Sequence, residues 1–506
     1  MDTESAQQEV GQRTLLVGTA RSVAELNHML KLVEPPLDQI GCVVHGPVAG
    51  LLVLPCLGGI DDLARVVVEH DIESVVLSLP KAMSSLTGRV AADLDQAGVP
   101  WRFIAMLADQ LAGRHVPVPA TASQGTGRSI ALAADASLID PWQLLRRRPR
   151  RLDKEAIRAV LAGRCVLITG AGGSIGSQLA RLVAGFDPSR IVLVERSENA
   201  LFEIDRQMAR FGESVERRAI LHDVTDRART AALVNAQAPQ VVFHAAAHKH
   251  VPMMEDHPAA ALENNFFGTC CVADASAAAG VERFVMISTD KAVNPSSVMG
   301  ASKRLAELYI QELNTRAAGA FSMVRFGNVL GSACSVLPIW CQQLAQGEPI
   351  TVTHPDMARY FMTIPEAAGL VLQSAALAQG GEVFLLDMGR PVKIVDLAHR
   401  FLRAAGLEPG GDVPIEFTSI RPGEKLREQL AYDTEDMRPT AHASIHTWRT
   451  APPGAARMRQ IQNTMDRLRE KDADGDDGDP WQGVSRDAIL NALRSAIPEM
   501  VHAAAG

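Results

Sequence analysis

Apolar runs of four to six residues alternate with longer segments of mixed polarity between residue 165 and about residue 330. Short runs rich in β-branched residues are typical of strands buried on both faces, and the segments between them are long enough for helices. Strand and helix in regular succession predict an α/β fold with a doubly wound parallel sheet of the Rossmann type. The predicted strands are 165–169, 191–195, 218–221, 241–246, 283–288 and 321–326.

A shorter series of the same kind fills the first hundred residues and predicts a small Rossmann-like α/β domain over residues 1–112. Its candidate phosphate loop is poor, because Gly18 is followed by Thr, Ala and Arg where a dinucleotide loop needs further glycines. We expect a degenerate unit with a structural or regulatory role, and a second cofactor site is the alternative. The predicted strands are 14–18, 51–55, 74–80 and 99–106, with helix-like residues 60–70 between the second and third.

The remaining boundaries follow from changes in composition. Residues 113–140 are rich in Ala, Ser, Thr and Gly, which predicts a linker over 113–150. The arginines of residues 144–153 form either a solvated hinge that packs on acidic neighbours or a phosphate- or membrane-facing surface. The division that we predict is a cofactor-binding and catalytic domain over 151–330, a substrate-binding lobe over 331–465 with segments returning to the core, and an acidic linker with a final helix over 466–506.

Charge and cysteine content argue against several classes of protein. A net charge of −8 over 506 residues does not fit a large nucleic-acid-binding surface, which needs clustered Lys and Arg. Seven scattered cysteines without CxxC pairs are typical of reduced thiols in a cytoplasmic protein and indicate neither a zinc site nor a disulfide framework. The acidic residues 472–479 lack the glycine and glutamate of a calcium loop, so we expect no metal site. The polar N-terminus and the lack of a long apolar run predict neither a signal peptide nor a membrane span.

A glycine loop joins the predicted strand 165–169 to an apolar helix. Gly170, Gly173 and Gly176 have the GxxGxxG spacing, which lets the chain turn tightly while the helix N-terminus faces a pyrophosphate. Glu195 ends the next strand, where it can accept hydrogen bonds from the adenosine ribose and favour NAD. Arg196 can instead pair with the 2'-phosphate of NADP, so the sequence leaves the choice of dinucleotide open.

The third strand of this domain is followed by Asp223, which can meet the adenine amino group or serve only as a loop aspartate. Further cofactor contacts are expected on the glycine loop and at the ends of the neighbouring strands. They are Ser174, Ile175, Val224, Ala245 and Ala246.

The strand at 283–288 ends in the polar sequence Ser288-Thr289-Asp290-Lys291. This is the end of a strand at which α/β sheets bind ligands, so we favour a catalytic role over a surface ion pair. In short-chain dehydrogenases the next helix carries Tyr-x-x-x-Lys, in which the tyrosine transfers a proton. Here Lys303 is present, but Met299 occupies the tyrosine position and cannot do acid–base chemistry.

Several motifs closely resemble the polysaccharide-biosynthesis nucleotide-sugar dehydratases of bacteria, which are extended short-chain dehydrogenases. The resemblance covers about residues 145–450, and residues 1–140 look like the domain that precedes the catalytic domain in the long, membrane-anchored members. In those members a transmembrane bundle comes first, and from this sequence we expect none. Long members carry Met at the tyrosine position, so Met299 fits that subgroup. The motifs are TGAGGSIGSQLAR, FHAAAHKHVPMMEDHP, ISTDKAVNPSSVMGASKR, VRFGNVLGS, VTHPDMARYFMTIPEA, LDMGRPVKIVDLA and RPGEKLRE.

The resemblance implies a 4,6-dehydratase of a UDP-N-acetylhexosamine, UDP-N-acetylglucosamine in particular, working in surface-glycan biosynthesis. It implies a tightly bound NAD or NADP that is regenerated in each turnover. By resemblance, Asp290 is the general acid toward the C6 hydroxyl and Lys291 the base at C5. Thr289 would hydrogen-bond the C4 hydroxyl, and Lys303 would bind the nicotinamide ribose.

The resemblance also implies contacts to the UDP-sugar. Asn328, Arg359 and Arg421 are expected at the diphosphate, although the two arginines could instead pair with Asp356 and Glu424. For His248, Lys249, His250 and Glu255, packing and substrate contact are equally open, and Glu424 completes the expected substrate set.

The chain departs from the family pattern in two places. Ala333 and Cys334 stand where Arg-Gly is usual, which removes one cation near the diphosphate, and Arg427 replaces a common aromatic residue.

Two other functions remain possible from the sequence. A nucleotide-sugar 4-epimerase, or a dehydratase of another sugar nucleotide, shares the glycine loop, but an epimerase normally keeps the tyrosine that Met299 replaces. A non-catalytic sugar-nucleotide sensor or scaffold would not need Thr289, Asp290, Lys291 and Lys303 together. We expect no nucleic-acid partner and a homo-oligomer, since dimers through helices of the Rossmann domain are usual in this superfamily.

Overall fold

The computed structural model divides the chain into two compact units, which are described separately. One comprises Met1–Asp140 with Leu402–Glu408, and the other comprises Pro141–Phe401 with Pro409–Gly506. The residues described are 13–30, 38–46, 54–80, 83–97, 99–104, 141–147, 150–405, 407–432, 437–448, 451–469, 480–481 and 483–501.

The first unit contains a five-stranded parallel sheet in the order β3-β2-β1-β4-β5. The strand expected at 51–55 is not found at 54–55, residues 51–53 lie outside the described part, and β3 begins at Cys56. The sequence pattern did not predict β2, which pairs with β1 around a bulge at Ile40 and buries four consecutive residues. The elements are β1 (Arg13–Thr19), α1 (Ala20–Leu30), β2 (Asp38–His45), β3 (Cys56–Gly59), α2 (Leu63–Glu69), β4 (Ser74–Ser78), α3 (Ser84–Gln96) and β5 (Trp101–Phe103).

The second unit is built on a nine-stranded sheet in the order β19-β20-β16-β11-β10-β9-β6-β7-β8, which confirms the doubly wound Rossmann-type fold. Seven neighbouring strands pair in parallel, and at one edge β20 pairs antiparallel with β16 and β19 pairs antiparallel with β20. All six expected strands are present. They are β6 (Cys165–Thr169), β7 (Arg190–Glu195), β8 (Glu216–Leu221), β9 (Val241–His244), β10 (Arg283–Ile287) and β11 (Ala320–Arg325), joined by β16 (Val383–Leu386), β19 (Arg438–Pro439) and β20 (Ile445–Trp448).

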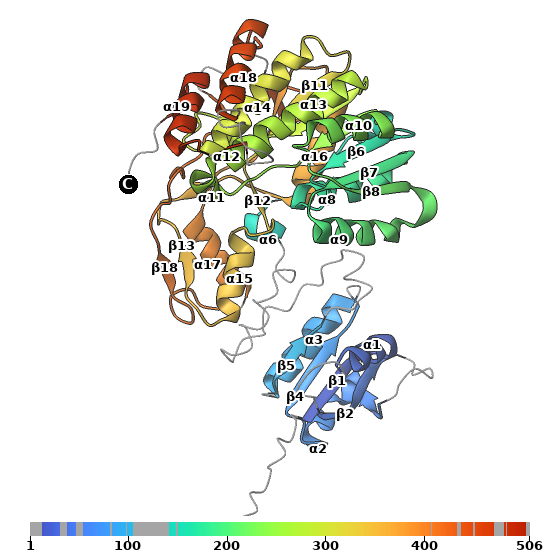
Figure 1. Cartoon of the computed structure of the whole chain (residues 1–506). Helices are drawn as coiled ribbons and strands as arrows, with labels where there is room; N and C mark the ends of the chain where they lie inside the picture. Colours follow the sequence, from blue (N-terminus) through green and yellow to red (C-terminus); the bar gives the residue numbers. More distant parts are fainter. Residues whose placement is uncertain are drawn as a thin grey trace, which may run out of the picture. The chain divides into compact units, whose positions relative to one another are not determined.

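Two groups of helices cover the two faces of this sheet, each with its own apolar core (Figure 1). One face is covered by α7 (Lys154–Leu161), α8 (Ser174–Val183), α9 (Glu198–Met208) and α16 (Ile364–Leu377). The other is covered by α10 (Arg227–Gln237), α13 (Gly268–Ala278) and α14 (Val298–Asn314), with α11 (Val251–Asp256) and α12 (Pro258–Ala261) beside them. Outside α14 lie α18 (Ala455–Arg469) and α19 (Arg486–Ala496).

A smaller lobe lies beside the carboxyl ends of the strands (Figure 1). Its helices pack through Trp340 and Phe401, whose ring centres are 5.5 Å apart. Because β16 and β20 return from this part of the chain to the main sheet, the lobe is tied to the core. Its elements are α15 (Val336–Ala345), β12 (Asn328–Leu330), β13 (Ile350–Val352), β14 (Ala358–Arg359), β15 (Phe361–Thr363), β17 (Val392–Lys393), α17 (Ile394–Ala404) and β18 (Ile415–Phe417).

The arginine-rich segment after α6 (Pro141–Leu145) is fastened to this unit. Arg147 donates to the carbonyls of Phe361 and Asp387 and pairs with the buried carboxylate of Glu366 at 2.8 Å. Arg150 pairs with Asp387 at 2.7 Å. For these two arginines the structure favours the hinge that packs on acidic neighbours.

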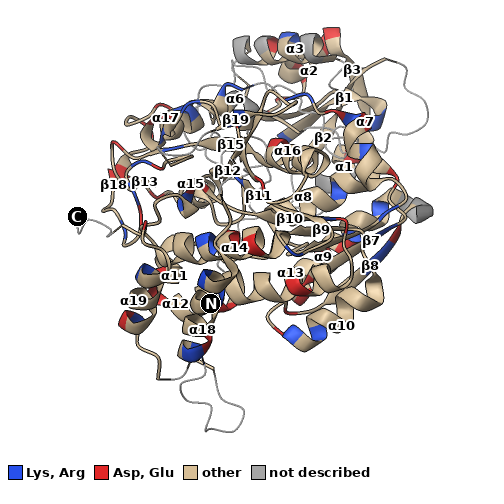
Figure 2. Ribbon diagram, turned by 90° about the horizontal axis from the view of Figure 1, so that it is seen from above, with Lys and Arg blue, Asp and Glu red and all other residues tan. Residues whose placement is uncertain are grey.

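Positive and negative side chains are interspersed over the ribbon (Figure 2). Helices long and apolar enough to cross a membrane were not found in the described part of the chain.

Candidate active site

The glycine loop follows β6, and several of its positions need glycine for steric reasons. Gly170 has a φ of +64°, and a Cβ there would lie 2.7 Å from the backbone nitrogen of Ala246. A Cβ on Gly176 would lie 2.1 Å from the carbonyl oxygen of Gly170. The first turn of α8 can therefore press against the loop, which leaves the helix N-terminus facing the edge of the sheet.

A hollow of about 270 Å³ lies beside this loop. It brings together eight of the residues predicted to bind the cofactor, which come from the ends of β6, β7, β8 and β9. They are Gly170, Gly173, Glu195, Arg196, Asp223, Val224, Ala245 and Ala246. The lining residues that the sequence analysis did not select are Gly172, Val194, Ala200, His222, Ala247 and Asn264, all but Asn264 adjacent to or within a few residues of a selected one.

The four other predicted cofactor residues do not line this hollow. Ser174 and Gly176 lie at the start of α8, where the Ser174 hydroxyl accepts from the backbone N–H of Ala333 at 3.1 Å. Ile175 packs against the apolar core. Lys303 lies on α14, on the other face of the sheet.

Glu195 and Arg196 are held by different partners. The carboxylate of Glu195 accepts from the backbone N–H groups of Gly172, Arg196 and Ser197 at 3.0–3.1 Å, which fixes it against the glycine loop. Arg196 donates to Nε2 of His248 at 2.9 Å and lies 3.8 Å from a carboxylate oxygen of Asp223. His248 thus orients Arg196.

The catalytic candidates follow β10, next to β9 in the sheet, so they share the edge that carries the hollow. Asp290 is fully buried, and its Oδ1 accepts from the Thr289 hydroxyl at 2.9 Å and from Nζ of Lys291 at 3.0 Å. Its Oδ2 has no hydrogen-bond partner among the described residues. A buried carboxylate with one unsatisfied oxygen is costly to maintain and is typical of a site that meets a ligand.

Lys291 lies among further charges that the sequence analysis missed. Its Nζ donates to Oδ1 of Asn328 at 3.2 Å and lies 4.0 Å from Glu428, whose Oε2 has no hydrogen-bond partner among the described residues. Burial alone would lower the pKa of Lys291, but Asp290 and Glu428 together outweigh it and raise that pKa. Lys425 lies 3.8 Å from Glu428, and burial lowers its pKa. Glu428 and Lys425 both belong to the RPGEKLRE motif, which is the part of the sequence that could have identified them.

Met299 and Lys303 are buried one turn apart on α14. A Cβ on Gly300 would lie 2.2 Å from the carbonyl oxygen of Lys291, so glycine lets the helix contact the catalytic loop. Burial lowers the pKa of Lys303 to about 8, and Glu307 partly opposes this effect. Burial, with a smaller contribution from Lys303, lowers the pKa of His244 to about 3, so that the imidazole is neutral.

The residues expected at the diphosphate have different surroundings. Arg359 is buried and donates to the carbonyls of Ala358 and Leu426 at 2.9 and 3.2 Å. The alternative partner considered for it, Asp356, pairs instead with Lys393. Arg421 is exposed and pairs with Glu424 at 2.7 Å, which is the alternative left open by the sequence.

Glu255 contacts protein groups with both carboxylate oxygens. One accepts from the backbone N–H of Val298 at 2.7 Å, and the other pairs with Arg486 at 2.9 Å. The structure thus favours packing over substrate contact, and we do not propose Glu255 as a substrate ligand.

The two neighbouring candidates are less enclosed. Lys249 donates to the carbonyl of Ala333 at 2.8 Å, and burial lowers its pKa. Burial lowers the pKa of His250 as well, with smaller contributions from Lys249 and Arg421.

Residues 423–432 fasten the substrate lobe to the loop after Lys291. Lys425 donates to the carbonyl of Val293 at 2.9 Å, and the Tyr432 hydroxyl donates to that of Ala292 at 3.0 Å. Gly423 has a φ of +79°, and a Cβ there would lie 2.9 Å from the side chain of Val251. This segment therefore closes one wall around Asp290 and Lys291.

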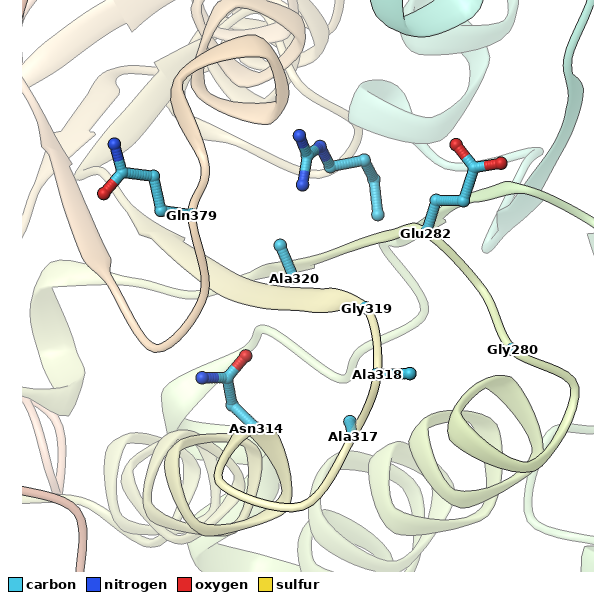
Figure 3. A pocket seen from close by; sticks show the side chains of 9 residues that line it. Gly280, Glu282, Asn314, Ala317, Ala318, Gly319, Ala320 and Gln379 are labelled. Carbon is cyan, nitrogen blue, oxygen red and sulfur yellow. The ribbon is translucent and has the colours of Figure 1, made fainter.

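A second hollow, of about 390 Å³, lies at the opposite ends of the strands, where β10 and β11 begin. Glu282, Asn314 and Gln379 surround it (Figure 3). None of the predicted site residues lines it. No group of three or more His, Cys, Asp or Glu side chains that could hold a metal ion was found in the part of the chain that the structure describes.

A glycine loop, a hollow of about 270 Å³ and a buried carboxylate–ammonium pair lie at the carboxyl ends of one set of parallel strands, which is the arrangement of a Rossmann-type protein. The family described as polysaccharide biosynthesis protein matches residues 166–450, and the chain belongs to this family.

Known proteins agree with this assignment. The chain is 51% identical over 299 residues to the capsular polysaccharide biosynthesis protein CapD of Staphylococcus aureus, covering 59% of this chain and 50% of that protein. It is 33% identical over 271 residues to an inverting UDP-N-acetylglucosamine 4,6-dehydratase of Campylobacter jejuni, covering 53% and 77%. The crystal structure of Pen from Bacillus thuringiensis is similar, with a TM-score of 0.53 and 28% identity over 57% of this chain and 89% of that one. The chain thus spans half the length of CapD.

Proposed function

We propose that the chain is a 4,6-dehydratase of a UDP-N-acetylhexosamine, with UDP-N-acetylglucosamine as the first substrate to test. The observation that carries the proposal is the hydrogen-bonded pair of Asp290 and Lys291, buried beside the strand ends that line the dinucleotide hollow. A 4,6-elimination needs one acid and one base close together, because a proton leaves C5 while the C6 hydroxyl departs as water. The named dehydratase relative from Campylobacter jejuni supports this class of reaction.

The pair provides both functions through a single proton. As the structure stands, Asp290 and Glu428 keep the proton on Lys291 by raising its pKa. The proposed roles, Asp290 as acid toward the C6 hydroxyl and Lys291 as base at C5, require that proton to cross the 3.0 Å hydrogen bond to Asp290. Exclusion of water by a bound sugar would favour the transfer, since it penalises two separate charges more than a neutral pair. Thr289 would hold the C4 hydroxyl.

The glycine loop and the hollow beside it suit a nicotinamide dinucleotide. The helix can approach the loop only because Gly176 has no Cβ, which would fill the contact between them. Gly170, Gly173 and Ser174 would hold the pyrophosphate, and Glu195 or Arg196 would meet the ribose of NAD or the 2'-phosphate of NADP. The bound dinucleotide would supply oxidation at C4 and the return of hydride to C6. Lys303 would fix the nicotinamide ribose, and its charge would stabilise developing negative charge.

Buried cations suit a nucleoside diphosphate substrate. Arg359, Lys291 and Lys425 lie together with the carboxylates of Asp290 and Glu428, since all four other groups influence the pKa of Lys425 and Arg359 also influences that of Lys291. We propose Arg359 and Asn328 as diphosphate contacts, with Lys249, His250, Arg421 and Glu424 nearer the open side.

The test is to incubate the purified full-length chain with UDP-N-acetylglucosamine in deuterated water, without added reductant, and to record proton NMR spectra. Dehydration predicts a new C6 methyl signal together with a 4-keto or hydrated-ketone species. Conversion to the C4 epimer without a methyl signal would replace the proposal by an epimerase. Binding without conversion of this or other UDP-sugars would favour a sensor.

A further inference from the structure

Two helices that follow the family-matched residues 166–450 pack against the helix that carries Met299 and Lys303. These helices, α18 and α19, lie along α14 (Figure 1). Arg457 of α18 donates to the carbonyl of Ser495 at the end of α19, which joins the two.

Arg486, at the start of α19, reaches the N-terminus of α14 through one intermediate. Its guanidinium pairs with the buried carboxylate of Glu255 at 2.9 Å and also donates to the Glu255 carbonyl at 3.1 Å. The other oxygen of that carboxylate accepts from the backbone N–H of Val298, the first residue of α14, at 2.7 Å. Arg486 thereby fixes the group that caps the catalytic helix.

A second chain of contacts reaches the end of β10. Glu499 pairs with Arg304 at 2.9 Å, and Arg304 donates to Glu307 at 3.2 Å. Glu307 is fully buried, and it also accepts from the hydroxyl of Ser288 at 2.7 Å. Ser288 directly precedes Thr289, so this chain of contacts ends next to the proposed catalytic residues.

A third contact reaches the loop between β10 and α14. The backbone N–H of Val501 donates to the carbonyl of Pro295 at 3.0 Å. Residues 486–501 thus hold the catalytic segment, defined as Ser288–Lys303, at its beginning, in its loop and at its helix.

We propose that the C-terminal residues 486–501 act as a brace that positions the catalytic segment, with Arg486 and Glu499 as positioning residues. This inference rests on the proposed function in assigning catalysis to Asp290, Lys291 and Lys303, although the mechanical coupling does not depend on the reaction. Small displacements of reacting groups are expensive, since an error of about 1 Å costs on the order of 100-fold in rate. Neither positioning residue touches the substrate in this scheme.

The first test is amide hydrogen exchange on the full chain, comparing wild type with Arg486→Met, Arg486→Lys and Glu499→Gln. Arg486→Met should raise exchange at residues 298–302 by about tenfold or more, as expected for loss of a charge-assisted hydrogen bond. Arg486→Lys should restore much of the protection, and Glu499→Gln should give a smaller rise. Arg459→Gln, at an exposed position of α18, is the control and should change nothing.

The residues at which hydrogen exchange increases decide whether the brace exists. Wild-type exchange at residues 298–302 in both Arg486→Met and Glu499→Gln would overturn the brace. An equal rise in β6 and β7 would also overturn it, because it would show general loss of stability instead of local coupling.

Kinetics then test positioning. In an enzyme that makes the methyl product, Arg486→Met should lower kcat by about 10- to 100-fold while KM and cofactor content stay close to wild type. An unchanged kcat despite faster exchange would overturn the positioning role. If the wild-type chain made no product, the proposed function would fail while the exchange result would still decide whether the brace exists.

Discussion

The two parallel sheets of this protein use the turn after their first strand in opposite ways. In the first unit, a Cβ on Gly18 would lie 2.2 Å from the carbonyl oxygen of Ser78. The hydroxyl of Ser22 donates to that carbonyl at 2.6 Å and accepts from the N–H of Thr19 at 2.9 Å. The start of α1 is therefore closed by the protein's own side chain.

In the second unit the corresponding turn contains four glycines. The first turn of α8 packs on Gly170 through Gly176, and the loop borders a hollow of about 270 Å³. A parallel sheet therefore determines where a site can lie but not whether a ligand can bind there. Whether a phosphate can enter depends on whether the turn leaves room at the helix N-terminus, as beside the hollow of the second unit, or closes that end with a side chain, as Ser22 does in the first unit.

The largest expected effect comes from removing one of the two proposed acid–base side chains while leaving the residues that line the dinucleotide hollow unchanged. Asp290→Asn or Lys291→Ala should lower turnover by at least about 100-fold, because each removes one partner of the proposed proton transfer. Cofactor content should stay near that of wild type, since neither residue lines the hollow. The measurements are product formation by NMR and dinucleotide released on denaturation. Normal turnover in either variant would contradict the assigned roles.

A matched pair of glycine substitutions sharpens the comparison directly. Gly176→Ala should weaken dinucleotide binding by roughly 10- to 100-fold, because overpacking against the backbone of Gly170 costs about 1–3 kcal/mol. Gly18→Ala should leave dinucleotide binding unchanged while lowering the stability of the first unit. Titration with NAD and NADP and thermal unfolding measure the two effects. Loss of binding in Gly18→Ala would instead indicate a second cofactor site in the first unit.

The smallest expected effect is on pH dependence. Because burial lowers the pKa of Lys303 to about 8, its charge is lost as pH rises through this value. If that charge supports the reaction, kcat/KM should fall above pH 8 and approach a tenfold loss per pH unit. Lys303→Arg should keep its charge and lose this decline. A decline that is identical in wild type and Lys303→Arg would assign it to another group.

The sequence predicted the second unit better than the first. Each of the six expected strands is found within a few residues, because β-branched runs buried on both faces have little alternative to a central parallel strand. In the first unit, β2 was missed and β3 was expected too early. Gly41 interrupts the apolar pattern of β2, and β3 is short and glycine-rich, so neither gives a strong periodic signal.

The residues that the structure brings together could be predicted where a short motif directly follows a strand. Glycine loop, Glu195 and the Thr289–Lys291 triplet all follow strands of one sheet, and strand ends converge by topology. Glu428 and Lys425 were missed although Arg421 and Glu424 of the same motif were selected, because the motif does not show which of its charges pack beside Asp290 and Lys291. Glu255 was placed among possible substrate ligands because its partner, Arg486, is over two hundred residues away.

By itself, the sequence determined the order of strands and helices, the turns that need glycine and the polar groups at the strand ends, since these depend on local periodicity and backbone conformation. Only the tertiary structure decided which carboxylates pair inside the protein, which oxygens of Asp290 and Glu428 lack a partner among the residues that the structure describes, and which lysines shift their pKa. Burial and charge proximity arise from distant segments packed together, and no local pattern encodes them. For the same reason the link from Arg486 to the start of α14 becomes visible only in the folded chain.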